Sequence, residues 1–149
     1  MKAVIQRVKS AEVSVQDQIT GKIGEGLLIL LGISDSDTED DLSYMVRKIT
    51  NMRIFEDKNE KMNLSVTDVS GSLLVVSQFT LFADTRRGNR PSFTDAGAPD
   101  FSRDMYEKFI LRCRDLGIPT EHGLFGAHML IDMTADGPVT IMLDSAAAH

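Results

Sequence analysis

The spacing of apolar residues predicts strands at both ends of the chain and two helices between them. Residues 2–15 (KAVIQRVKSAEVSV) place apolar side chains near every second position and are rich in β-branched types, which is typical of a strand. A short hairpin element follows in residues 16–26. Residues 26–33 (GLLILLGI) are apolar on both faces, which indicates a central strand that is covered on both sides.

Two stretches have the periodicity of amphipathic helices. The first begins at Asp37 or Thr38, carries acidic residues in its first turn, and predicts one buried stripe made of Leu42, Met45, Val46 and Ile49. The second begins at Pro99 and ends at Gly117, and the predicted stripe consists of Phe101, Met105, Phe109, Cys113 and Leu116. Because Cys113 lies on that stripe, we interpret it as a core thiol and not as a nucleophile.

The remaining apolar segments complete a mixed α/β fold. A hairpin is predicted in residues 52–66, the strongest strand signal lies in residues 70–84, and two further strands lie in residues 127–133 and 138–144. The chain is therefore expected to form one layered domain, residues 1–149, of about nine short mixed strands and two main helices. No glycine-rich nucleotide-binding motif follows any of these strands.

Composition and charge narrow the class of protein. A single cysteine fits a reducing compartment, and the longest apolar run is too short to cross a bilayer, so we expect a cytoplasmic protein without membrane contact. The net charge of −6 argues against a broad nucleic-acid-binding surface. The segment RRGNR is a local exception, and its Arg86, Arg87 and Arg90 are either a solvated loop or a phosphate clamp.

Polar residues directly follow the apolar run of residues 73–76. Ser77, Gln78 and Thr80 are either bonded to backbone groups at a sheet edge or left facing a ligand, because unpaired buried polar groups cost free energy. Thr80 is a candidate nucleophile by its type, but no histidine or lysine is close in sequence to act as its base. His122 and His128 have no familiar metal spacing, so we expect neither a metal nor a cofactor.

Several motifs together resemble a known family. AVIQRV, GLLILLGI, MRIF, KMNLSV, LLVVSQFTL, TRRGNRPSF and DGPVT occur in the order typical of the D-aminoacyl-tRNA deacylases of the bacterial and eukaryotic type, the DTD family, over nearly the whole chain. The combination of SQFTL with a C-terminal GPVT is highly specific. The resemblance implies a homodimer of layered β-sheets with helices on one side, a β/β/α arrangement, and an active site at the dimer interface.

The resemblance also implies an activity. Members of the family hydrolyse the ester between a D-amino acid and the 3′-terminal adenosine of tRNA, and they remove glycine mischarged onto alanine tRNA. They reject L-aminoacyl-tRNA and so proofread translation. The tRNA 2′-hydroxyl is implied to assist the attack of water, which would explain the missing side-chain base.

The resemblance assigns roles to particular residues. Ser77, Gln78, Phe79 and Thr80 would line the pocket, with the backbone N–H groups around Gln78 and Phe79 as oxyanion-hole donors. Gly137 and Pro138 would form a Gly-cisPro pair that enters the partner's pocket and selects chirality. Phe125 and Met129 would pack against the terminal adenosine, and Arg7 would lie near the interface and the GPVT turn.

The chain departs from the family pattern at Leu124, His128 and Ala135, which leaves the hydrogen bonding near the turn open. Two other functions stay open from the residues themselves. One is a non-catalytic module that binds RNA ends or nucleotides on the same fold. The other is a conventional serine or threonine esterase, which requires a base that the sequence does not supply.

Overall fold

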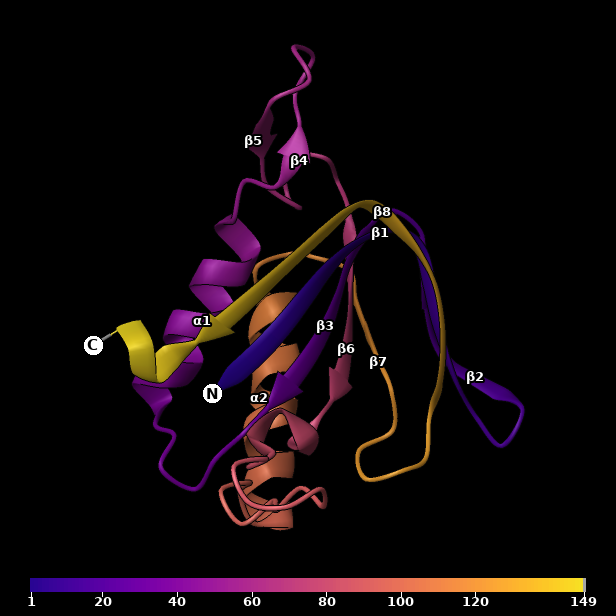
Figure 1. Cartoon of the computed structure of the whole chain (residues 1–149). Helices are drawn as coiled ribbons and strands as arrows, with labels where there is room; N and C mark the ends of the chain where they lie inside the picture. Colours follow the sequence, from indigo (N-terminus) through magenta and orange to yellow (C-terminus); the bar gives the residue numbers. More distant parts are fainter. Residues whose placement is uncertain (149) are drawn as a thin grey trace.

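The computed structural model describes residues 1–148, and its main feature is a strongly curved six-stranded sheet (Figure 1). The strands run in the order β2-β1-β3-β6-β7, and β8 pairs with β1. Their bounds are β1 Lys2–Val15, β2 Gln18–Ile23, β3 Gly26–Gly32, β6 Ser72–Ser77, β7 Thr120–His122 and β8 Leu130–Asp144. A separate ribbon joins β4 (Phe55–Glu56) to β5 (Met62–Leu64), so the predicted hairpin in this region is confirmed.

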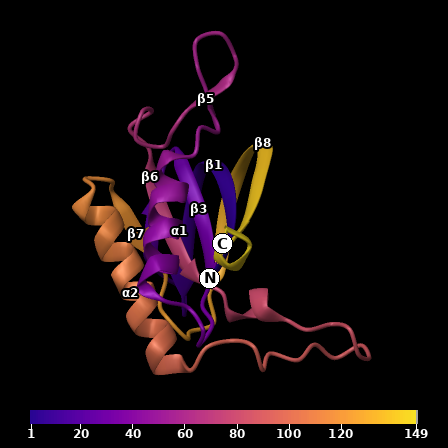
Figure 2. The same ribbon diagram turned by 90° about the vertical axis from the view of Figure 1, so that its left-hand side faces the viewer.

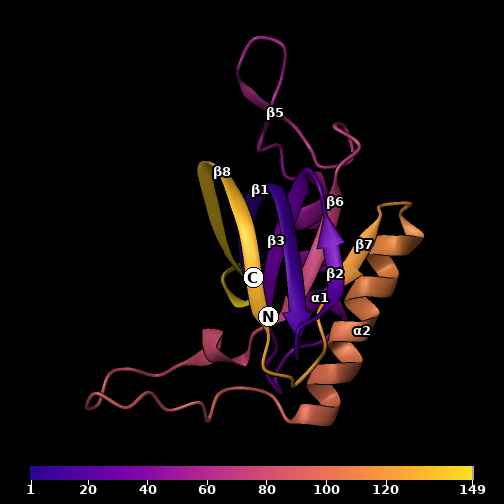
Figure 3. The ribbon, with the colours of Figure 1, turned by 90° about the vertical axis from the view of Figure 1, so that its right-hand side faces the viewer.

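Both helices cover the same side of the sheet, α1 at Glu39–Asn51 and α2 at Pro99–Asp115 (Figures 2 and 3). The larger core cluster lies between these helices and the sheet, and a smaller one lies inside the curl of the strands. The pairs β3–β6 and β6–β7 are parallel, and the other pairs are antiparallel. The predicted mixed α/β class with two main helices is confirmed.

The predicted helix boundaries and buried faces agree closely with the structure. Thr38 is the N-cap of α1 and forms a reciprocal capping box with Asp41, and all four residues of the first predicted stripe are buried. On α2, burial raises the pKa of the Cys113 thiol to about 12, as expected for a core cysteine. Two residues of the second predicted stripe differ: Phe101 is only partly buried, and Leu116 follows the last turn as the C-cap and is 57% exposed.

The two strands expected at the C-terminal end are one continuous strand. β8 is 15 residues long because β1 is nearly as long and pairs with it from Lys2↔Asp144 to Ser14↔Leu130. The register shifts on both sides of Val8, so residues 136–139 bulge opposite Arg7 without ending the strand. The peptide bond between Gly137 and Pro138 lies in this bulge and is cis, as expected.

The strongest predicted strand is shorter than its apolar pattern suggested. β6 ends at Ser77, and residues 79–82 form a 3₁₀ helix, η1. The short strand β7, which has no clear sequence signal of its own, adds to the sheet beside β6. The change from strand to η1 turns the chain at the point where the polar residues begin.

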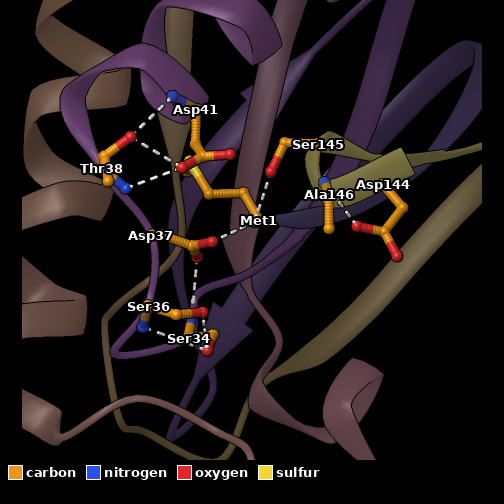
Figure 4. A network of polar contacts seen from close by, with 9 residues as sticks. All are labelled: Met1, Ser34, Ser36, Asp37, Thr38, Asp41, Asp144, Ser145 and Ala146. Atoms are coloured by element: carbon orange, nitrogen blue, oxygen red, sulfur yellow. Dashed lines mark hydrogen bonds and ion pairs between the residues drawn. The ribbon is translucent and has the colours of Figure 1, made fainter. Parts of the chain in front are cut away.

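A polar network fastens the beginning of β1 to the loop before α1 (Figure 4). The amino group of Met1 pairs with the Asp37 carboxylate and donates to the Ser145 hydroxyl at 2.7 Å. Ser145 opens the 3₁₀ helix η2 (Ser145–Ala148), directly after β8. The network therefore links both long strands to the first helix.

Candidate active site

A cavity of about 530 Å³ opens at the carboxyl ends of the parallel strands β3 and β6. The start of α2 and residues 125–129 form its other walls. In α/β sheets, ligands bind outside the carboxyl ends of parallel strands. The cavity brings together five of the predicted site residues: Ser77, Gln78, Phe79, Phe125 and Met129.

The wall of this cavity is largely apolar and carries no acidic side chain. Its polar side chains are those of Ser77, Gln78, Ser102 and His128. Among residues 1–148, no group of three or more histidine, cysteine or acidic side chains is placed to hold a metal. Such a wall suits a ligand with a flat apolar body and a few polar groups.

The backbone at the end of β6 changes the expected set of oxyanion donors. The N–H of Gln78 donates to the Leu31 carbonyl at 2.8 Å, because the β3–β6 ladder continues for one residue past the strand. The Gln78 N–H is therefore already used within the sheet, and the expectation that it is an oxyanion-hole donor is wrong. The N–H groups of Phe79 and Thr80 have no acceptor within the described chain, since they open the first turn of η1.

The side chain of Thr80 lies beside the cavity and does not line it. It is exposed, and its hydroxyl accepts a hydrogen bond from the Gln78 side-chain amide. His128 does line the cavity, although no motif in the sequence marks it as a site residue. Within the described residues no hydrogen bond joins His128 to Ser77 or Thr80, so this arrangement does not form a nucleophile–base pair.

Helix α2 holds Phe125 in place from outside the cavity. The Tyr106 ring lies 5.7 Å from the Phe125 ring, and the Arg103 guanidinium lies 5.3 Å from the same ring. The Tyr106 hydroxyl donates to the Val75 carbonyl at 2.8 Å, and burial raises the pKa of this hydroxyl. Arg103 and Tyr106 are three residues apart on α2, a spacing that the apolar pattern alone does not mark as functional.

A second cluster contains Arg7, Gly137 and Pro138. Arg7 is 5% exposed and donates to the carbonyls of Ile54 at 2.7 Å and Asp136 at 3.2 Å. Its Nε also lies 3.3 Å from the Asp136 carboxylate. Arg7 therefore ties the first residue of the bulge in β8, Asp136, to the chain directly before β4.

This second cluster is remote from the cavity of its own chain. Arg7 pairs with Leu27 and Ala3 pairs with Leu31, which lines the cavity. A separation of four residues along a strand is roughly 13 Å. None of the three residues of the cluster lines the cavity.

The three loop arginines are not equivalent. Arg86 makes two side-chain bonds to the Asp84 carboxylate, at 2.9 and 2.7 Å, and these bonds lower the pKa of Asp84. Arg87 and Arg90 are exposed and form no ion pair with a described residue. The guanidinium of Arg86 is thus engaged within the loop, while Arg87 and Arg90 are available to a ligand.

The comparisons with known proteins agree with one another. The family model described as D-Tyr-tRNA(Tyr) deacylase matches residues 4–144. The chain is 51% identical over 146 residues to "D-aminoacyl-tRNA deacylase" of Clostridioides difficile (strain 630), with 98% of each chain covered. It is 50% identical over 145 residues to the protein of the same name from Thermosipho africanus (strain TCF52B), with 97% of each covered.

Solved structures show the same fold. The structure described as "c-Myc DNA Unwinding Element Binding Protein" superposes with a TM-score of 0.91 at 43% identity, over 97% of this chain and 98% of that one. A "probable eukaryotic D-amino acid tRNA deacylase" superposes with a TM-score of 0.82 at 18% identity, over 95% and 97%, and at that identity it supports the fold alone. On the family match and the two relatives at about half identity, the chain belongs to the D-Tyr-tRNA(Tyr) deacylase family.

Proposed function

We propose that the protein is a cytoplasmic hydrolase that cleaves the ester bond of D-aminoacyl-tRNA and releases the free D-amino acid and tRNA. The observation that carries this proposal is that Phe79 lines an apolar cavity and its N–H has no acceptor among the described residues, in a chain that belongs to a deacylase family. An N–H without an internal partner suits an oxyanion that forms during acyl transfer.

The proposed reaction uses the tRNA itself as part of the machinery. The terminal adenosine packs against Phe125 and Met129, and the ester carbonyl accepts a hydrogen bond from the Phe79 N–H. Water attacks the carbonyl carbon with help from the adenosine 2′-hydroxyl, the bond to the ribose 3′-oxygen breaks, and that oxygen takes up a proton. The protein contributes orientation and an oxyanion hole, which can supply much of the rate without a side-chain base.

We assign the choice of D-substrates to Gly137 and Pro138 of a partner subunit in a homodimer. The distance of this pair from the cavity of its own chain supports a role in a neighbouring one. Strand β8 also supports dimer formation, because among the described strands it pairs only with β1, and its Met142 is 79% exposed. The side chain of an L-amino acid would clash with the inserted turn. Glycine has no side chain and does not clash, so glycine on alanine tRNA is also a substrate.

A deacylation assay tests the proposal. Purified protein is mixed with matched D- and L-aminoacyl-tRNA, and we expect release of the D-amino acid only. The competing function is a non-catalytic module that binds nucleic-acid ends, which the name of the 43% identical structure makes worth testing. That function predicts tRNA binding with no release from either substrate, while release from both would indicate an unselective esterase.

Thr80→Ala should keep deacylation within about tenfold of the parent protein, because the Thr80 hydroxyl lies beside the cavity and does not line it. The measurement is kcat on D-aminoacyl-tRNA, with Thr80→Ser as the control that retains the hydroxyl. Loss of a triad nucleophile lowers kcat by several orders of magnitude. A loss of that size in a folded Thr80→Ala protein, or a trapped acyl ester on Thr80, would contradict the mechanism.

The double variant Arg87→Ala/Arg90→Ala should weaken tRNA binding and reduce its salt dependence. Each lost phosphate contact flattens the slope of log K against log salt by roughly 0.7 to 0.9. The control is Lys58→Ala/Lys61→Ala, which removes the same charge from the exposed turn between β4 and β5. Equal slopes for the two double variants would show that the loop is merely solvated.

A further inference from the structure

Phe79, which lines the cavity, contacts a second aromatic side chain, Phe93, and neither ring is buried. The rings of Phe79 and Phe93 lie 5.2 Å apart in an edge-to-face arrangement, with an interplanar angle of 76°. Phe79 is 58% exposed and Phe93 is 38% exposed, although large aromatic side chains usually contribute to a core. The pair therefore presents ring surface to solvent beside the place where the terminal adenosine is proposed to bind.

Phe93 belongs to a long projecting segment, residues 83–98, which we call the arm (Figures 2 and 3). Its base is fixed by backbone hydrogen bonds between Asp84 and Ser92, at 2.7 and 3.0 Å. Its return to α2 is fixed by the Gly97 N–H, which donates to the Ile33 carbonyl at 2.9 Å. Phe93 follows Ser92 directly, so its backbone lies next to the paired base of the arm, and its ring contacts that of Phe79.

The arm carries unpaired positive charge as well as Phe93. In sequence, Arg87 and Arg90 lie between Asp84 and Ser92, the two paired residues at the base of the arm, and they have no carboxylate partner among the described residues. The remaining loop arginine is engaged by Asp84. Exposed rings next to free guanidinium groups are the combination by which proteins hold unpaired nucleotides, through base stacking and phosphate contacts.

We propose that Phe93, supported by Phe79, stacks the base of the unpaired nucleotide that directly precedes the terminal adenosine. Phe79 lines the cavity and contacts Phe93 on the arm. The two rings therefore connect the proposed adenosine site to the arm. Phosphates of the same RNA chain then contact the guanidinium groups of Arg87 and Arg90. The inference rests on the proposed function, because it takes the cavity as the adenosine site.

Two substrates of different length test this inference. One is a D-aminoacyl ester of a single adenosine, and the other is the same ester on an RNA oligonucleotide with an unpaired 3′ end. Stacking on an aromatic side chain contributes about 1–3 kcal/mol per base, a factor of roughly 5 to 150. For Phe93→Ala, the ratio of kcat/KM on the long substrate to that on the short one should fall by this factor.

Matched variants separate the effect of base stacking from the effect of side-chain volume. Phe93→Tyr keeps a ring and should retain most of the ratio, while Phe93→Leu keeps apolar volume without a π face and should behave like Phe93→Ala. The control is Ile19→Ala, an exposed apolar side chain on β2. An unchanged ratio for Phe93→Ala overturns the inference, and so does a change of oligomeric state in sedimentation, which would make Phe93 a protein contact.

The design also separates failure of this inference from failure of the proposed function. If the parent protein does not release the amino acid from D-aminoacyl-tRNA, the proposed function fails. Binding of the uncharged oligonucleotide, measured by fluorescence anisotropy, then still tests the stacking. We expect Phe93→Ala to raise its Kd by the same factor, and an equal Kd in the two proteins would overturn the inference.

Discussion

Replacing Phe79 by proline should lower kcat on D-aminoacyl-tRNA by about 100- to 1,000-fold, the usual cost of one lost oxyanion-hole donor. Proline removes the backbone N–H of residue 79 and nothing else from the backbone. The position accepts proline because it is the first residue of η1, where an N–H has no helical partner. Gln78 precedes it with φ −144° and ψ 80°, outside the α region that a following proline disfavours.

Phe79→Ala is the matched control, since it also removes the ring but retains the N–H. The difference in kcat between the two variants therefore measures the N–H alone, and thermal unfolding checks that both are folded. If Phe79→Pro and Phe79→Ala have the same kcat, the Phe79 N–H does not stabilise the oxyanion. The Thr80 N–H would then be the remaining backbone donor at the start of η1.

Gly137→Ala should reduce the preference for D- over L-aminoacyl-tRNA by about 100-fold, since a displacement of about 1 Å in a positioned group can cost this much. Gly137 has φ +125°, a conformation that L-residues rarely adopt. An added Cβ would lie 2.8 Å from Val139 Cγ2 and 3.2 Å from Arg7 Nη2. The bulge must move to relieve these contacts. It would then no longer occupy the position where the side chain of an L-aminoacyl substrate collides with it.

Gly117→Ala provides the control for backbone strain by itself. Gly117 also has a positive φ, +80°, but nothing lies within 4 Å of its added Cβ. We expect this control to lose some stability and to keep its D-over-L preference. An unchanged preference in folded Gly137→Ala protein would contradict the assignment of chirality selection to this turn.

The parts of the fold that follow from local pattern could be predicted, and those that depend on long-range pairing could not. The capping of α1 at Thr38 and its buried stripe are local properties of the sequence. The continuity of β8 depends on β1, more than a hundred residues away, which carries the ladder past the bulge. The apolar pattern breaks at residues 134–138, so the two halves of β8 have the appearance of separate strands.

In the candidate site, too, some residues could be predicted from local sequence and others depend on long-range packing. Ser77 and Gln78 stand out as polar residues after an apolar run, whereas Phe125 and Met129 were identified only by resemblance. The use of the Gln78 N–H by Leu31 depends on the register of β3 against β6, which the sequence does not reveal. Arg103 and Tyr106 gain their role from the packing of α2 against Phe125, so no sequence pattern marks them.

The pairing of β1 with β8 has a consequence for synthesis on the ribosome. Ser14 pairs with Leu130, so 116 residues must be added before the two meet. At 5–20 residues per second this takes roughly 6–23 s, during which one edge of β1 has no partner. An unpaired apolar strand edge is prone to associate with other chains. We therefore expect codons that slow translation between β1 and β8 to lengthen this exposure and to reduce the soluble yield of the protein.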